Sequence, residues 1–303
     1  MKFEFIHEHR HEHTISRMCQ VLGVSKSGYY DYLNRLDREE TKREAWNRYI
    51  DERILFHYHD NYGCYGSPRI HFMLREVDQV EVSQKKVTNR MRELDLYATP
   101  PKKFINTTDS DHDETIHSNH LNRDFLPEAP DQVWATDITY IHTGEGFLYL
   151  NPVIDLASRR IISYQLDDHM DHTLCLKALE KALAIRNPKS GWIHHSDRGS
   201  QYCSKAYLDT LKEAGATISM SRKGNPYDNA CAESFFASLK KEYLYKHVYE
   251  TKAEAKLAIQ FYINFYNQKR LHSTLDYLTP LEKEKSYKMN HDKKLKKNQM
   301  SSA

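Results

Sequence analysis

Three short runs of β-branched and aromatic residues, all after residue 130, constrain the fold of this chain more than any other feature. They read VWATDITYIH, FLYLNPVIDLA and RRIISYQL, and a Gly-Glu-Gly turn separates the first two. Runs of this length and composition are typical of strands, and the short turn favours antiparallel pairing. We therefore expect three antiparallel strands in this part of the chain.

Helices and strands alternate after these three runs. A helical segment, DHTLCLKALEKALAIR, precedes the short strand GWIHHSD, and a helix around SKAYLDTLKEAG precedes the short strand ATISMS. Long helices are then expected from Asp228 to Tyr245 and from Lys252 to Tyr266. Asp228 is the expected N-cap of the first helix, and Ala232, Phe235, Phe236 and Leu239 are expected to pack it on the core. Strands followed by alternating β and α units predict a mixed α/β layer fold.

The first hundred residues are predicted to be helical. Residues 14–35 read as two short helices joined by the turn LGVS, a helix-turn-helix pattern that generic helical hairpins share. An amphipathic helix over 37–58 and the segments RIHFMLREV and VSQKKVTNRMRELDL form a second, similar unit, with Ser83 as an expected N-cap. Its lysines and arginines suit either phosphate contacts or a solvated helix face.

These patterns divide the chain into five parts. We expect a helix-turn-helix at 1–38, a second helical region at 39–98, a linker rich in Pro, Ser, Thr and Asp at 99–127, an α/β part with C-terminal helices at 128–282, and a basic tail at 283–303. The tail carries seven lysines against three acids from residue 281 onward, and such ends are typically solvated.

Composition excludes several classes of protein. No run of 18 apolar residues occurs, and the charged N-terminus lacks an apolar signal segment, so we expect neither a membrane span nor secretion. Five scattered cysteines without a CxxC pair predict neither disulfides nor a cysteine zinc site, which suits a reducing cytoplasm. The net charge of +2 argues at first sight against a nucleic-acid partner, but this total hides an acidic N-terminal part and a basic tail.

Three acids stand in unusual positions. Asp137 interrupts the first strand, Asp197 ends the strand GWIHHSD, and Glu233 lies early on the helix that begins near Asp228. A charge in a central strand is costly unless it is paired or binds a metal. Acids from separate elements suit two Mg²⁺ ions about 4 Å apart, which stabilise the attacking and leaving oxygens of a phosphoryl transfer. Taken singly, each acid is more typical of an ordinary strand end or a surface than of a metal site.

Four ordered motifs resemble those of a known family, the DDE transposases with a retroviral-integrase-like core, specifically the second-frame product of two-frame bacterial insertion sequences. VWATDITYI, IHHSDRGSQYCS and GNPYDNACAESFFASLKKE resemble its three signature segments, and 35 residues lie between Asp197 and Glu233, as in its DD(35)E group. FYINFYNQKRLHSTLDYLTP resembles its C-terminal signature, and YGSPRI with VSQKKV resembles its upstream helical region. The resemblance runs from about residue 14 to residue 282.

The resemblance implies an RNase H-like, integrase-type catalytic core at 128–282, preceded by an all-α helix-turn-helix region. It implies a Mg²⁺-dependent DNA transposase, with Mn²⁺ as a possible substitute, that nicks element ends and transfers the 3′-hydroxyl to DNA during transposition, integration and recombination. Asp137, Asp197 and Glu233 would be the catalytic acids and would hold two ions.

Four basic residues are candidates for DNA contact. Lys240 matches the basic residue that such enzymes carry seven positions after the glutamate, which puts it within about 20° of Glu233 and about 10 Å along the helix. Arg222 and Lys223 begin a loop that resembles the flexible loop beside the active site of integrases. Arg270, just beyond the last core helix, is a candidate phosphate ligand.

The resemblance also implies partners and a location. These are the terminal inverted repeats of the element, target DNA, at least a second protomer on DNA and the upstream-frame helix-turn-helix protein, all in the bacterial cytoplasm and at the nucleoid. Two alternatives stay open: a DNA-binding regulator of transposition with an inactive core, and an RNase H-like nuclease that cuts RNA:DNA hybrids. The three intact acids argue against the first alternative, and the helix-turn-helix units against the second.

Overall fold

The computed structural model describes residues 1–36, 38–98, 117–222 and 226–300. The chain divides into two compact units, Met1–Arg53 and Ile54–Ala303, each of which we describe by itself. Most of the linker expected at 99–127 and the loop residue Lys223 lie outside the described residues. No helix in the described ranges is long and apolar enough to cross a membrane.

The first unit is a small helical cluster. Its elements are α1 (Lys2–Glu8), α2 (Ile15–Leu22), α3 (Lys26–Leu36) and the start of α4 (Lys42–Asp60). Ile6, Met18, Cys19 and Tyr29 form its buried centre. Gly23 ends α2 with a φ of +62°, a left-handed conformation that glycine adopts without strain. The helix pair predicted for residues 14–35 is thus confirmed. The structure adds α1, which precedes this pair.

The second unit begins with two more helices, α5 (Ser67–Glu76) and α6 (Gln84–Glu93). The hydroxyl of Ser83 accepts a hydrogen bond from the backbone N–H of Lys86, so the predicted N-cap of α6 is confirmed. Ile70 and Leu74 of α5 are buried. Val87 and Met91 of α6 are also buried and are likewise four residues apart. Each helix therefore presents one apolar stripe to the interior.

In the described part of the chain, six strands form one sheet. They are β1 (Val133–Thr136), β2 (Thr139–Thr143), β3 (Gly146–Asp155), β4 (Ile161–Asp167), β5 (Ile193–Ser196) and β6 (Thr217–Met220). One edge of β3 pairs antiparallel with β4, and its other edge pairs first with β2 and then with β1. β1 and β2 thus act as a single strand with a break, and β5 and β6 extend the sheet in parallel beyond β1. The three antiparallel strands predicted from sequence are confirmed.

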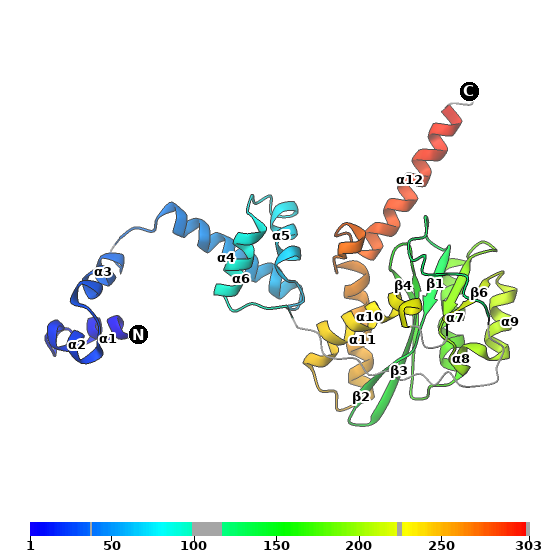
Figure 1. The fold of residues 1–303 in the computed structure, drawn as a ribbon, viewed down its shortest axis with the longest axis horizontal. Helices are drawn as coiled ribbons and strands as arrows, with labels where there is room; N and C mark the ends of the chain where they lie inside the picture. The colour runs from blue at the N-terminus through cyan, green and yellow to red at the C-terminus, as the bar shows by residue number, and fades with distance from the viewer. Residues whose placement is uncertain (37, 99–116, 223–225, 301–303) are drawn as a thin grey trace. The chain divides into compact units, whose positions relative to one another are not determined.

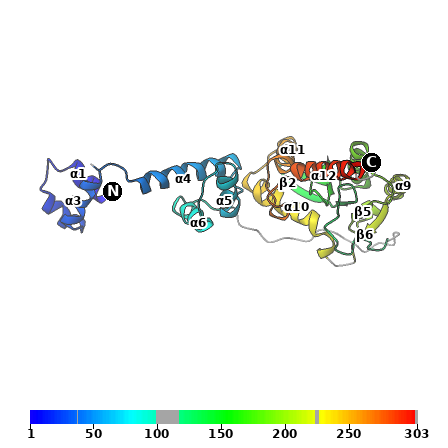
Figure 2. The ribbon, with the colours of Figure 1, turned by 90° about the horizontal axis from the view of Figure 1, so that it is seen from above.

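Helices cover both faces of this sheet. The helical elements that follow β4 along the chain are α7 (His172–Arg186), α8 (Ser200–Cys203), α9 (Lys205–Glu213), η1 (Pro226–Asn229), α10 (Ala230–Glu242), η2 (Leu244–Lys246), α11 (Lys252–Gln268), η3 (Ser273–Leu275) and α12 (Pro280–Met300). One apolar cluster joins the sheet to α10 and α11, and another joins it to α7 and α9 on the other side (Figures 1 and 2). This three-layer arrangement confirms the predicted mixed α/β fold.

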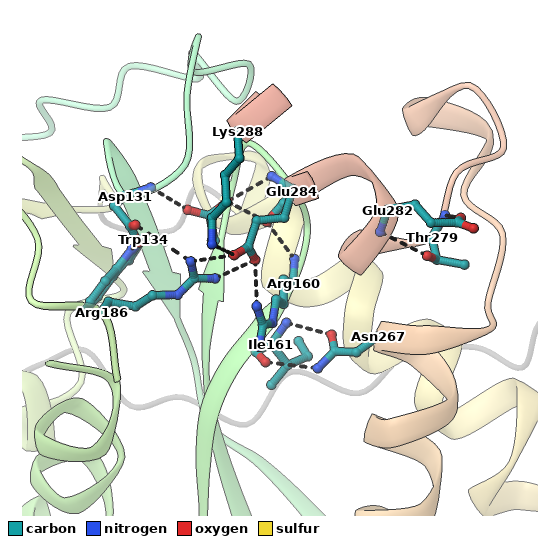
Figure 3. Close-up of polar contacts among 12 residues, drawn as sticks. Asp131, Trp134, Arg160, Ile161, Arg186, Asn267, Thr279, Glu282, Glu284 and Lys288 are labelled. Carbon is teal, nitrogen blue, oxygen red and sulfur yellow. Dashed lines mark hydrogen bonds and ion pairs between the residues drawn. The ribbon is translucent and has the colours of Figure 1, made fainter. Parts of the chain in front are cut away.

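The C-terminal end differs from expectation. Instead of a solvated tail from residue 283, α12 runs from Pro280 to Met300. Its first turns are held by Glu284, whose buried carboxylate accepts hydrogen bonds from Arg160 and Arg186 (Figure 3). The two guanidinium groups compensate the charge of this buried carboxylate. A count of charges along the sequence does not reveal this pairing.

Candidate active site

Asp137 and Asp197 lie at neighbouring positions on the sheet. β1 and β5 pair in parallel with Val133 opposite Ile193 and Ala135 opposite His195. The same register, continued by two residues, sets Asp137 opposite Asp197. Asp137 falls in the break between β1 and β2, and Asp197 directly follows β5. Two carboxylates from segments 60 positions apart therefore meet at the ends of adjacent parallel strands.

The two carboxylates influence each other. Burial raises the pKa of Asp137 well above its usual range, the nearby Asp197 carboxylate raises it further, and Glu233 adds a smaller effect of the same sign. The backbone N–H of Ile138 donates to Asp137 Oδ1 at 2.8 Å, and that of Gly199 donates to Asp197 Oδ1 at 2.9 Å. The structure thus brings Asp137 and Asp197 together and sets Glu233 within electrostatic reach.

Asn151 fixes the strand break that carries Asp137. This residue of β3 is fully buried, and its amide nitrogen lies 2.8 Å from the Asp137 carbonyl oxygen, 2.9 Å from Thr136 Oγ1 and 2.7 Å from Tyr202 Oη. Sequence reasoning did not single out Asn151. The available signal was a polar residue in the middle of the apolar run FLYLNPVIDLA.

Glu233 lies in the first turn of α10. Burial raises its pKa. The predicted apolar stripe of this helix, which includes Phe235, Phe236 and Leu239, is buried and packs it against the sheet. This packing determines where Glu233 lies relative to the strand ends.

Asp228 does not cap α10 as expected, because Asn229 occupies the N-cap position. The buried Asp228 carboxylate instead accepts hydrogen bonds from the backbone N–H and guanidinium of Arg222, from Arg123 and from Asn119. Hydrogen bonding to Arg222 lowers the pKa of Asp228. Asp228 thus ties the segment 119–123 and Arg222 to the turn that immediately precedes the helix carrying Glu233.

The predicted DNA contacts have different surroundings. Lys240 is half-buried, with its ammonium 5.2 Å from the centre of the Tyr140 ring. Burial lowers its pKa, and the Asp137 carboxylate opposes this shift, so Lys240 also lies within electrostatic reach of the acids. Arg222 is exposed at the loop beside them and pairs with Asp228.

Arg270 contradicts its predicted role as a phosphate ligand. Only 5% of it is exposed, and its guanidinium donates to both carboxylate oxygens of Glu242 and to Ser238 Oγ. Charge compensation by Glu242 makes this burial possible, and the guanidinium does not face solvent, from which a phosphate would approach.

Residues around Arg270 instead hold the first helices of the unit against its C-terminal part. Tyr65 Oη donates to the carbonyl of Lys269 and accepts from the N–H of Leu271, and Phe72 stacks on Tyr277 with ring centres 4.8 Å apart. The C-terminal sequence signature therefore contributes a docking surface for residues 62–77.

The strand-end carboxylates have the donor chemistry of a divalent cation site. Oxygen ligands suit hard cations such as Mg²⁺, and two facing carboxylates repel each other unless a proton or a cation lies between them. Within the described residues, no three His, Cys, Asp or Glu side chains stand close enough together to hold a metal ion. Asp137 and Asp197 therefore fit such an ion as a pair, and Glu233 would have to approach them.

Models of known protein families match most of the chain. The integrase core domain matches residues 127–226, a second integrase core domain matches 214–280, and an HTH-like domain matches 45–104. These matches confirm the predicted integrase-type core and the helix-turn-helix-like region.

Curated relatives are similar over nearly their whole length. The chain is 38% identical to transposase InsF for insertion sequence IS3A of Escherichia coli (strain K12) over 92% of this chain and 97% of the relative. It is 39% identical to the insertion element IS600 uncharacterized 31 kDa protein of Shigella sonnei, over 87% and 96%. It is 38% identical to the transposase for insertion sequence element IS904 of Lactococcus lactis subsp. lactis (strain IL1403), over 82% and 99%.

Solved structures give weaker likenesses. The simian T-cell lymphotropic virus intasome in complex with PP2A regulatory subunit B56 gamma has a TM-score of 0.46 at 13% identity, covering 73% of this chain and 70% of that one. The HTLV-2 integrase catalytic core domain in complex with magnesium has a TM-score of 0.40 at 16% identity, covering 51% and 96%.

Proposed function

The chain belongs to the family of IS3-type insertion-sequence transposases with an integrase core, and from this premise we propose how it catalyses DNA transposition. In our proposal, Asp137, Asp197 and Glu233 hold two Mg²⁺ ions, for which Mn²⁺ can substitute. The enzyme nicks the ends of its element and transfers the freed 3′-hydroxyl to DNA. The observation that carries this proposal is the register that sets Asp137 opposite Asp197.

The proposed reaction consists of two phosphoryl transfers. In the first, a water oxygen forms a bond to phosphorus while the bond to the 3′-oxygen breaks, and that oxygen leaves with the electron pair and takes up a proton. In the second, the new 3′-hydroxyl gives up its proton and attacks a phosphorus of the target, displacing another 3′-oxygen. Bound Mg²⁺ supplies positive charge for the attacking and leaving oxygens.

The chain's own groups orient the DNA and the acids in this scheme. Asn151 holds the backbone of Asp137, and the packing of α10 determines the position of Glu233. Lys240 and Arg222 pair with phosphates beside the acids, and Lys223, the next residue in the sequence, assists. Both strand-end acids must be charged to hold the cations, so binding of the cations favours loss of their protons.

The proposed partners follow from the reaction. The enzyme binds the terminal inverted repeats and target DNA, and joining of two ends requires at least two protomers on DNA. We also propose association with the upstream-frame protein of the element and action in the bacterial cytoplasm, at the nucleoid.

A joining assay on labelled element ends, in Mg²⁺ and in EDTA, tests the proposal. The wild type should nick and join in Mg²⁺ alone, whereas Asp137→Asn, Asp197→Asn and Glu233→Gln should bind ends and lose at least 10³-fold in both steps, since the ions supply several kcal/mol. Calorimetric titration of the protein–DNA complex with Mg²⁺ should show that each variant binds Mg²⁺ more weakly than the wild type does.

Other outcomes of this assay identify the alternatives. Joining retained by any of the three variants would overturn the assignment of the acids. End binding without joining by the wild type would indicate an inactive regulator. Cleavage of RNA:DNA hybrids without joined product would indicate a nuclease.

A further inference from the structure

A pocket of about 610 Å³ lies beside the candidate active site, and of the residues that line it only Lys240 has a role in the reaction described above. Its walls come from β2, the end of α10, η2 and residues 247–250. Among the described residues, β2 pairs with β3 alone, so the pocket lies along its other edge. The N–H of Gly144 donates to the carbonyl of Tyr249 and joins the two walls.

The walls of this pocket are rich in aromatic rings. Tyr140 and His142 are two positions apart on β2, so their side chains project to the same face of the sheet. The ring of Phe147 packs edge-on against both, with its centre 5.2 Å from that of Tyr140 and 5.4 Å from that of His142. Tyr245 also lines the pocket, and 51% of it is exposed. Burial and the neighbouring Tyr140 both raise the pKa of Tyr245, so the two phenol groups lie near each other. Flat, accessible rings of this kind are stacking surfaces.

Lys240 connects the pocket to the acids. It lines the pocket, its ammonium lies 5.2 Å from the Tyr140 ring centre, and the Asp137 carboxylate acts on its pKa. Along α10, Lys240 lies about 10 Å from Glu233, a length that about three stacked base steps cover. A strand whose phosphate lies at the acids can therefore reach the pocket with one of its next few nucleotides.

We propose that this pocket binds an unpaired nucleotide of the element end, with its base stacked on Tyr245 and its phosphate paired with Lys240. The inference rests on the proposed function and adds a binding site to it. A pocket of this size holds a molecule comparable to one nucleotide, so the terminal base pair must open first. Opening costs free energy, which stacking on an aromatic ring offsets.

The nucleotide is favoured over a peptide strand added to the edge of β2. A peptide would need the backbone groups of β2 and no cation, whereas Lys240 joins the aromatic pocket to the carboxylates at which DNA reacts. Glu250 is the one acidic residue among those that line the pocket.

Equilibrium binding of element-end duplexes to the full-length protein tests the site, with Ca²⁺ in place of Mg²⁺ so that no DNA is cut. Each of the last five nucleotides of either strand is replaced in turn by an abasic residue. Tyr245→Ala should weaken binding of the intact end about tenfold, the effect of losing one stacked base. On the duplex that lacks the bound base, Tyr245→Ala and wild type should bind equally. Tyr245→Phe, which keeps the ring, should behave as wild type on every duplex.

Two results would overturn the proposal. One is unchanged binding of the intact end by Tyr245→Ala, with its fold checked by circular dichroism. The other is a loss of binding that persists on every abasic duplex. If Tyr245→Ala instead changes self-association in sedimentation without changing DNA affinity, the pocket is a protein contact and the proposal is wrong.

Failure of the pocket assignment and failure of the proposed function give different results in these assays. Glu233→Gln should retain the dependence on the bound base although it does not join ends. If the wild type joins ends and Tyr245→Ala binds and joins normally, only the pocket assignment fails. If the wild type does not join ends but the base dependence persists, the reaction assignment fails and the pocket assignment stands.

Discussion

At the scale of single residues, side chains with a sequence motif could be predicted and their supporting partners could not. Asp137, Asp197 and Glu233 stand out because acids at strand ends and in a spaced pattern are visible in a sequence. Asn151 is not visible in this way, since its partners Thr136 and Tyr202 lie 15 and 51 positions away. The burial of Arg270 is not visible in the sequence for the same reason, because it depends on pairing with Glu242. Long-range pairing, which a local pattern does not encode, determines both roles.

Replacement of Asn151 should affect both stability and metal use. Asn151→Leu keeps the approximate volume but leaves Thr136 Oγ1 and the Asp137 carbonyl without this donor, which should cost about 1–3 kcal/mol of unfolding free energy. Because the strand break that carries Asp137 then loosens, half-maximal joining should require several-fold more Mg²⁺. Denaturant unfolding and Mg²⁺ titration of the joining rate measure the two effects.

Ser163→Ala is the matched control for Asn151→Leu. It also removes a buried hydrogen bond from the sheet, to the carbonyl of Ala178, away from the acids. We expect a comparable loss of stability and an unchanged Mg²⁺ requirement. An equal Mg²⁺ requirement in both variants would show that Asn151 is merely structural.

At the scale of elements, the existence and type of the helices and strands could be predicted from the sequence. The contacts at the start of a helix could not. The period of apolar residues in α10 indicated which face packs on the core, and the structure agrees. The start of α10 was misjudged because an aspartate before a helix usually caps it, whereas Asp228 here gathers Arg222, Arg123 and Asn119. Two of these partners lie more than 100 positions upstream, beyond any capping motif.

Asp228→Asn should loosen the segment before α10. The amide retains the shape of the carboxylate but loses the charge-assisted bonds to the two arginines, which should cost about 2 kcal/mol. Hydrogen bonding lowers the pKa of Asp228 in the folded chain, so its contribution is present above the unfolded pKa of about 3.9 and disappears as pH falls below it. The variant should therefore lose stability at pH 7 and show a smaller further loss on acidification than wild type.

Limited proteolysis and denaturant unfolding at pH 7 and pH 3 measure these effects of Asp228→Asn. Asp209→Asn on α9 is the control, because its pair with Lys212 is exposed and such pairs contribute little. Equal unfolding free energies for Asp228→Asn and Asp209→Asn would contradict the role given to Asp228.

At the scale of the whole molecule, the layer fold followed from the order of strands and helices, but the docking of α5 onto the C-terminal part of its unit did not. That contact depends on shape matching between Phe72 and Tyr277 and on the two hydrogen bonds of Tyr65. Periodicity identifies which face of a helix is apolar and leaves open what it packs against. Tertiary packing of this kind also buries ionisable groups, which couples the stability of the fold to pH.

Buried histidines, His194 and His272 among them, should make the fold sensitive to mild acid. Burial lowers the pKa of His194 to about 3, and burial together with nearby arginines lowers that of His272 to about 2. Both are neutral in the folded chain at pH 5, whereas in the unfolded chain, with a pKa of about 6.5, both are protonated. Their contribution is therefore full above pH 6.5 and declines below it. Between pH 8 and pH 5 the unfolding free energy should fall by about 2 kcal/mol for each histidine.

His194→Gln isolates one of these two contributions. Glutamine can still hydrogen-bond the hydroxyl of Tyr207, the partner of His194, but it does not titrate. Denaturant unfolding at pH 8, 6.5 and 5 should give a total decline about 2 kcal/mol smaller than that of wild type. His169→Gln, on the exposed loop before α7, should leave the wild-type decline unchanged. A wild-type decline in His194→Gln would mean that His194 is protonated in the folded chain, and a buried imidazolium beside Tyr207 would then have to be stabilised by a carboxylate.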